Sequence, residues 1–147
     1  MSAPAPALDR AAMEAFLRRE YPHAGFNDGR LVLADYARGH CRVRLPLDER
    51  NIRPGPSVSG PAIMWLGDVS AWIALLSVIG PVPLAVTANL TVSFLRPAGL
   101  AELVCDCRTL RVGRRLAVML AEVARASDGA AAAHMTITYA IPPGARG

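Results

Sequence analysis

The sequence predicts an α+β domain in which an antiparallel sheet curls round one long apolar helix. Residues 60–79 form the most apolar stretch of the 147-residue chain, and Gly80-Pro81 ends it abruptly. A helix that is apolar nearly all round must be covered on most of its sides. Four segments of alternating apolar and polar residues follow it, as strands with one buried face do. A curved sheet wrapped round the helix satisfies both patterns.

The residues ahead of the long helix predict a shorter helix and a hairpin. Residues 8–19 predict an amphipathic helix. The residues at helical spacing on its expected inner face are Leu8, Ala12, Ala15, Phe16 and Arg19. Residues 30–37 and 40–45 predict two strands, and Arg38-Gly39 between them predicts the turn of a hairpin.

Local signals mark both ends of the long helix. Residues 51–59 form a loop rich in Pro, Gly and Ser, and either Ser57 or Ser59 can cap the helix that follows. Pro61 falls in the first turn, where the missing N–H of proline costs nothing. The helix is therefore expected to run to about Ile79.

Four strands and their turns complete the expected domain. The alternating segments are residues 84–95, 102–112, 115–127 and 131–141. Gly113-Arg114 and Asp128-Gly129 lie at the two expected hairpin turns, and Asp-Gly is a strong turn signal. Because no linker or internal repeat divides the chain, we expect a single domain over residues 1–147. Its N-terminal helix covers about residues 8–20 and its core about residues 30–141.

Composition narrows the classes of function. The formal net charge is +4, and none of the 16 basic residues is lysine. The arginines are scattered and aromatic residues are few, so no nucleic-acid-binding patch is indicated. Three cysteines provide no even disulfide framework, and no spacing of Cys and His indicates a metal site. The first residues lack the basic and apolar regions of a signal peptide, so we expect a protein of the reducing cytoplasm.

The apolar stretch is just long enough to be tested as a membrane span. Residues 61–79 could cross a bilayer by length. However, Asp68 lies near the middle, where inserting a carboxylate costs ~2.5–3.5 kcal/mol. A helix buried inside the domain explains the stretch better, so no membrane partner is expected.

Asp68 is the residue that most suggests chemistry. It is the one charged residue between Pro54 and Leu95. Burying an unpaired carboxylate is costly, and burial changes the reactivity of an acid, so an isolated acid in an apolar helix is a functional candidate. Two structural alternatives remain open: an exposed Asp at the rim of the helix, or a buried Asp paired with an Arg from elsewhere.

Three motifs resemble a known family. Ser59 to Asp68 resembles the motif that opens the central helix of PaaI-type acyl-CoA thioesterases (His-Gly-Gly, four residues, Leu, one residue, Asp), and Gly60, Leu66 and Asp68 match it. Residues 85–97 resemble the strand after that helix, and residues 113–116 resemble a later turn. The resemblance covers about residues 30–141. It implies a hot-dog fold, with a curved antiparallel sheet of about five to six strands round the central helix.

The resemblance also implies roles for particular residues. It places Asp68 as the general base or nucleophile that attacks the thioester, without a separate cofactor. Gly60, at the helix N-terminus, matches the donor to the oxyanion, and Thr87 matches a hydroxyl that orients water. Asn51 resembles an asparagine that holds the thioester or water. The site of such enzymes lies across a dimer interface, so a homodimer or homotetramer is expected.

Further residues are predicted to bind the acyl-CoA substrate. Trp65 and Trp72 share a helix face with Asp68 and could favour a flat or short acyl group. The phosphates of coenzyme A would meet planar arginine side chains. The remaining candidates for binding the substrate are Asn89, Arg96, Arg114 and Arg115.

Two departures from the family pattern leave a second function open. Ser59 stands where the family has histidine, and Pro61 removes one backbone N–H from the helix N-terminus. The alternative is therefore a catalytically weak or silent hot-dog protein that binds acyl-CoA or lipid, or acts as an assembly partner.

Overall fold

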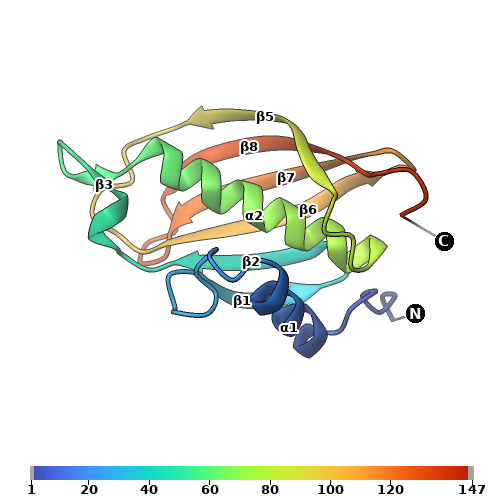
Figure 1. Cartoon of the computed structure of the whole chain (residues 1–147). Coiled ribbons are helices and arrows are strands. Elements are labelled where there is room, and N and C mark those ends of the chain that lie inside the picture. Colours follow the sequence, from blue (N-terminus) through green and yellow to red (C-terminus); the bar gives the residue numbers. More distant parts are fainter. Residues whose placement is uncertain (1, 146–147) are drawn as a thin grey trace.

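A computed structural model describes residues 2–145 of the chain as one long helix inside a curved sheet (Figure 1). The sheet has the strand order β1-β2-β6-β7-β8-β5, and every adjacent pair is antiparallel. The helices are α1 (Arg10–Glu20) and α2 (Gly60–Ile79), with a 3-10 turn η1 (Glu49–Asn51). The strands are β1 (Val32–Ala37), β2 (His40–Leu45), β3 (Ile52–Arg53), β4 (Ser57–Val58), β5 (Val86–Phe94), β6 (Leu103–Val112), β7 (Leu116–Arg125) and β8 (Ala131–Ala140).

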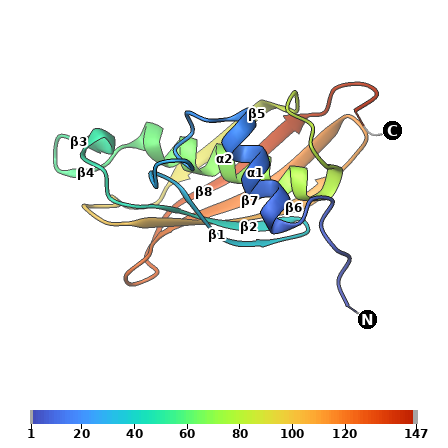
Figure 2. The same cartoon turned by 60° about the horizontal axis from the view of Figure 1, so that its bottom comes forward.

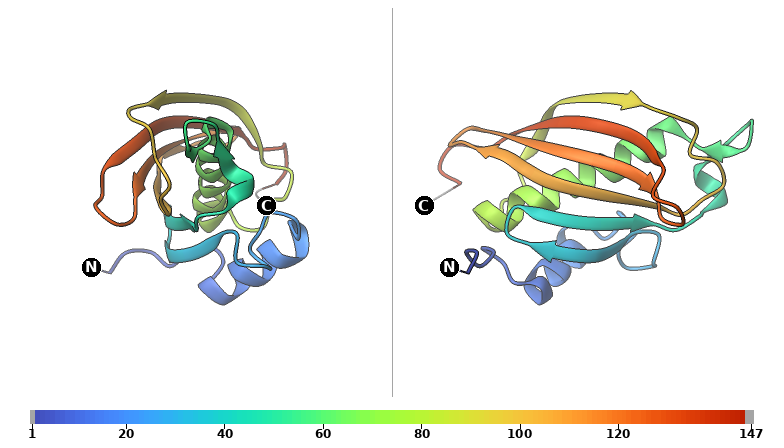
Figure 3. Two further views of the ribbon diagram at one scale, coloured as in Figure 1. Left: turned by 90° about the vertical axis from the view of Figure 1, so that its left-hand side faces the viewer. Right: turned by 180° about the vertical axis from the view of Figure 1, so that it is seen from behind.

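The central helix is covered as the sequence predicts. The end-on view in Figure 3 shows the sheet curling round α2. Thirteen of its residues are buried, including Leu66, Ile73 and Leu76. By length and composition α2 could cross a membrane, but 72% of its most apolar window is buried inside the protein, as in the core helix of a globular domain.

Both ends of α2 are formed by the residues that the sequence singled out. The Ser59 Oγ accepts a hydrogen bond from the Ala62 N–H at 3.3 Å, so Ser59 is the cap. Ser57 is not the cap, because its buried hydroxyl instead accepts from the Gly99 N–H at 2.9 Å. The helix ends at Gly80, whose φ of 89° is a conformation that residues with a side chain rarely adopt.

The short helix α1 buries a different face from the predicted one. It starts at Arg10, with the Asp9 side chain accepting from the Ala12 N–H at 2.8 Å. Its buried residues are Met13, Phe16 and Leu17, whereas Ala12, Ala15 and Arg19 are exposed. Met13 and Leu17 bury more apolar area than Ala12 and Ala15 would. The buried face therefore lies about one residue further along the helix than the predicted face. Figure 2 shows α1 lying across α2, and the rings of Phe16 and Trp72 lie 5.6 Å apart.

The predicted strands are present, with bounds shifted by at most two residues. The inner face of β8 carries Met135, Ile137 and Tyr139, all buried, as their alternation predicts. Strand β5 is different because it lies at the edge of the sheet and is exposed along most of its length, including Val86 and Phe94. The two-residue strands β3 and β4 fall in the segment that the sequence predicts as loop.

Candidate active site

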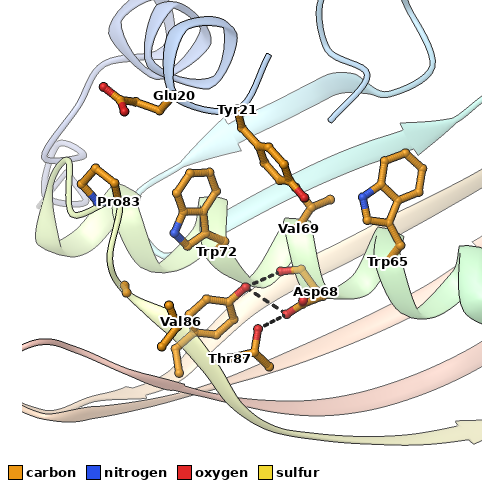
Figure 4. Close-up of a pocket in the computed structure, with 11 residues that line it drawn as sticks. Glu20, Tyr21, Trp65, Asp68, Val69, Trp72, Pro83, Val86 and Thr87 are labelled. Carbon is orange, nitrogen blue, oxygen red and sulfur yellow. Dashed lines mark hydrogen bonds between the residues drawn. The ribbon is translucent and has the colours of Figure 1, made fainter. Parts of the chain in front are cut away.

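Asp68 lies in the middle of α2 and faces a cavity of about 460 Å³ (Figure 4). Eleven residues from α1, α2, the α2–β5 connection, β5 and β8 line this cavity. They are Glu20, Tyr21, Trp65, Asp68, Val69, Trp72, Pro83, Ala85, Val86, Thr87 and Tyr139. Asp68 is partly exposed, so its carboxylate is accessible from the cavity although most of the helix round it is buried.

Two hydroxyl groups hold one oxygen of the Asp68 carboxylate. Thr87 Oγ1 donates to Asp68 Oδ1 at 2.7 Å, and the Tyr139 hydroxyl lies 2.9 Å from the same oxygen. The Tyr139 hydroxyl also lies 3.0 Å from the backbone carbonyl oxygen of Asp68. Within residues 2–145 no group donates to Asp68 Oδ2 and no cation pairs with the carboxylate. The alternative of an Asp paired with an Arg is therefore excluded for the described chain.

The register of the sheet brings the two hydroxyls together. Thr87 on β5 pairs directly with Tyr139 on β8, and the hydroxyls of both side chains reach Asp68 on α2. The register shifts immediately after Thr87, which separates it from the regular run that begins at Asn89. Tyr139 is only 4% exposed. Burial and the neighbouring Asp68 raise the pKa of Tyr139 far above its ordinary value, so its hydroxyl stays protonated and acts as a donor.

Aromatic side chains form the wall beside Asp68. Trp65 and Trp72 both line the cavity, as their shared helix face predicts. Tyr21, at the end of α1, meets Trp72 edge to face with ring centroids 6.0 Å apart. Neither Tyr21 nor its neighbour Glu20 was a sequence candidate. Their local sequence pattern does not indicate that the end of α1 lies over the middle of α2. That placement comes from the packing of Phe16 against Trp72.

Gly60 is the first residue of α2 and does not contact Asp68 of the same chain. It lines a second cavity, of about 570 Å³, together with Phe94 and Arg96. Eight residues along a helix correspond to a rise of about 12 Å, which keeps the two apart. The Gly60 N–H has no acceptor among the described residues. In the same turn Pro61 has no N–H, and Ser59 accepts from both Ala62 and Ile63.

The remaining predicted residues lie outside the Asp68 cavity. Asn51 is in η1, where its backbone oxygen accepts from the Ser59 N–H at 2.8 Å near the start of α2. Asn89 is exposed on β5 and its side-chain oxygen accepts from Thr91 at 3.2 Å. Arg114 and Arg115 lie in the β6–β7 turn beside a third cavity, of about 240 Å³. The structure thus groups Asp68, Thr87, Trp65 and Trp72, and separates them from the other candidates.

Tyr139 is the functional candidate that sequence reasoning missed. Its position on the inner face of the last strand was predicted, because it alternates with Met135 and Ile137. The available signal was its hydroxyl, since a phenol on an otherwise apolar inner face needs a polar partner. What the pattern could not reveal was the partner, because Asp68 lies 71 residues away in the chain.

The segment that carries Asp68, Thr87 and Tyr139 matches a known protein family. A protein-family model described as the thioesterase superfamily matches residues 55–139, more than half of the chain, and spans α2, Thr87 and Tyr139. The chain belongs to the thioesterase superfamily. The matched segment contains Gly60 and nine of the eleven residues that line the Asp68 cavity, and the other two, Glu20 and Tyr21, precede it.

Solved structures share the fold over most of their length. A candidate thioesterase of Silicibacter sp. TM1040 is 34% identical, with a TM-score of 0.84 and 94% of each chain covered. The PaaI protein of the E. coli phenylacetic acid degradation operon has a TM-score of 0.73 at 18% identity, covering 88% of this chain and 96% of its own. A hypothetical thioesterase of Streptococcus pneumoniae, solved with coenzyme A, has a TM-score of 0.75 at 17% identity, covering 89% and 97%. The predicted hot-dog thioesterase fold is therefore confirmed.

A curated relative matches a shorter region. A candidate esterase of Thermoplasma acidophilum is 29% identical over 79 residues, which make up 54% of this chain. The chain spans 59% of the length of that relative.

Proposed function

We propose that this member of the thioesterase superfamily hydrolyses acyl-CoA thioesters through Asp68. The observation that supports the proposal most strongly is the arrangement of the Asp68 carboxylate, which borders a cavity. Its Oδ1 accepts hydrogen bonds from two hydroxyl groups, and its Oδ2 has no hydrogen-bond donor within the described chain. Coenzyme A in the S. pneumoniae structural neighbour supports a CoA thioester as the substrate.

Either of two steps begins at the free oxygen of Asp68. As a general base, Oδ2 takes a proton from water while the water oxygen bonds to the thioester carbonyl carbon. As a nucleophile, Oδ2 bonds to that carbon directly and forms an anhydride that water then hydrolyses. In both routes the C–S bond breaks, the sulfur leaves as a thiolate that takes up a proton, and the products are a free acid and coenzyme A.

We propose that a homodimer completes the site. The oxyanion formed at the carbonyl needs a donor, and Gly60 presents an unpaired N–H at the positive end of the α2 dipole. Gly60 and Asp68 of one chain line separate cavities, so a second copy is the source of the donor. The exposed edge strand β5, with apolar Val86 and Phe94, supports pairing between copies.

The cavity walls support a flat or short acyl group. Trp65, Trp72 and Tyr21 provide aromatic surface round Asp68, and flat groups stack well against such walls. We assign the phosphates of coenzyme A to the exposed arginines Arg96, Arg114 and Arg115.

A free-thiol release assay over aryl-, short- and long-chain acyl-CoAs tests the proposal. Asp68→Asn keeps the shape of the side chain and removes its basicity, so activity should fall about 10²-fold or more. Asp35→Asn changes an exposed carboxylate on β1 away from the cavity and is the matched control. Equal rates for wild type and Asp68→Asn would sink the mechanism.

A second candidate function follows from the N-terminus of α2. Pro61 leaves Gly60 as the single free donor of the first turn in the described chain, which is a weak oxyanion site. A silent acyl-CoA-binding protein would bind acyl-CoA in calorimetry but release no thiol from any substrate.

A further inference from the structure

The two oxygens of Asp68 have different surroundings. Oδ1 accepts from Thr87 at 2.7 Å and lies 2.9 Å from the Tyr139 hydroxyl, while Oδ2 has no donor among residues 2–145. Two donors on one oxygen restrict rotation of the carboxylate about its Cβ–Cγ bond. The oxygen that remains available to water or to a thioester is Oδ2.

Of the two donors, Tyr139 is the more firmly held. Its ring lies on the inner face of β8, a strand paired on both sides, and is 4% exposed. Thr87 lies near the start of the edge strand β5 and is exposed. A donor fixed in the core keeps its position without a further entropic cost when substrate enters, whereas a donor on an open edge must be ordered.

Tyr139 does not itself exchange protons near neutral pH. Burial and the adjacent Asp68 raise its pKa far above the ordinary value, so it remains a neutral hydroxyl. Its effect on a reaction at Asp68 can therefore come only through the hydrogen bond.

We infer that Tyr139 is a positioning residue, whose hydroxyl holds Oδ1 of Asp68 so that Oδ2 faces the reacting atoms. This inference rests on the proposed thioester hydrolysis. A purely structural role is the competing account, in which Tyr139 serves only the backbone oxygen of Asp68, 3.0 Å away, and packs in the core.

Tyr139→Phe removes the hydroxyl and keeps the ring, and Tyr36→Phe is the matched control. The Tyr36 hydroxyl donates to the Leu8 carbonyl oxygen at 2.7 Å, outside the Asp68 cavity, so Tyr36→Phe also loses one hydroxyl hydrogen bond. For Tyr139→Phe we expect kcat to fall about 10-fold with KM within about 2-fold. A loss confined to kcat is a readout that a purely structural role of the hydroxyl would not produce. Tyr36→Phe should leave kcat and KM unchanged.

An unchanged kcat in Tyr139→Phe, with Asp68→Asn still inactive, would overturn the inference and leave the proposed function intact. Absence of turnover in the wild type would instead overturn the proposed function. In that case a double-mutant cycle of Tyr139→Phe and Asp68→Ala, which removes the accepting oxygen, followed by urea unfolding at pH 7, decides whether the hydroxyl serves the carboxylate. We expect a coupling of about 10-fold in the unfolding equilibrium constant for a hydrogen bond to a charged group. Additive effects in the cycle would overturn the assignment.

Discussion

The sharpest test of the composite site is Gly60→Pro. The first turn of α2 holds one N–H without an acceptor in the described chain, that of Gly60, because Pro61 has none and Ser59 accepts from Ala62 and Ile63. Proline at residue 60 removes this donor alone. The position tolerates proline because it opens the helix, and Ser59 before it has φ −72° and ψ 154°, which a following proline favours.

The expected loss follows from that single donor. Removing one oxyanion donor costs about 10²–10³ in kcat, or about 2.7–4 kcal/mol, in well-studied hydrolases. No second N–H in the turn can replace the one that Gly60 supplies, so we expect the full effect. Thermal stability should stay close to wild type, because the lost N–H has no partner among residues 2–145.

Gly60→Ala is the matched control for size. It keeps the N–H and adds a Cβ that would lie 3.3 Å from Cζ of Phe94, a side chain that is 51% exposed and can move slightly. Thiol release by Gly60→Ala should stay within a few-fold of wild type. Equal rates for the proline and alanine variants would refute the role of the N–H.

Mixing variants tests where the donor comes from. If Gly60 of one copy serves Asp68 of the other, a heterodimer of Gly60→Pro and Asp68→Asn chains has one intact site. Re-equilibrated mixtures of the two inactive variants should then recover about a quarter of wild-type activity. No recovery, with exchange of subunits confirmed by mass spectrometry, would place both groups in one chain.

Two further predictions concern the cavity wall and the core. Tyr21→Ala removes the edge-to-face partner of Trp72 and widens the cavity, so kcat/KM for bulky relative to short acyl-CoAs should rise about 10-fold, and an unchanged ratio would contradict the role of Tyr21. Burial raises the pKa of Cys105 to about 12 from 9.0, and the pKa values of the buried Cys41 and Cys107 are also raised. Because the folded state holds these protons more tightly, stability is fully present below about pH 9 and should fall above it, by about 1.4 kcal/mol per pH unit for each thiol. Urea unfolding at pH 8 and pH 10 measures this, and Cys105→Ala should show a smaller fall than wild type; equal falls would contradict it.

The helix and strands were largely predictable because their signals are local. The cap at Ser59, the stop at Gly80 and the alternation of β6 to β8 each depend on a few neighbouring residues. The buried face of α1 was predicted wrongly. Two helix faces one residue apart have equally regular spacing, so the spacing could not show which of them is buried. The buried face depends on the packing of Phe16 against Trp72 on α2.

The sequence by itself determined the long helix, the six strands round it and the isolated acid at Asp68, because period and composition are properties of the chain. Only the tertiary structure decided what surrounds that acid. Thr87 and Tyr139 reach Asp68 Oδ1 because β5 and β8 pair in one register beneath α2, whereas Gly60 on the same helix faces a separate cavity. Contacts between residues 19 and 71 positions apart depend on strand pairing and packing, which the spacing of residues in the chain does not specify.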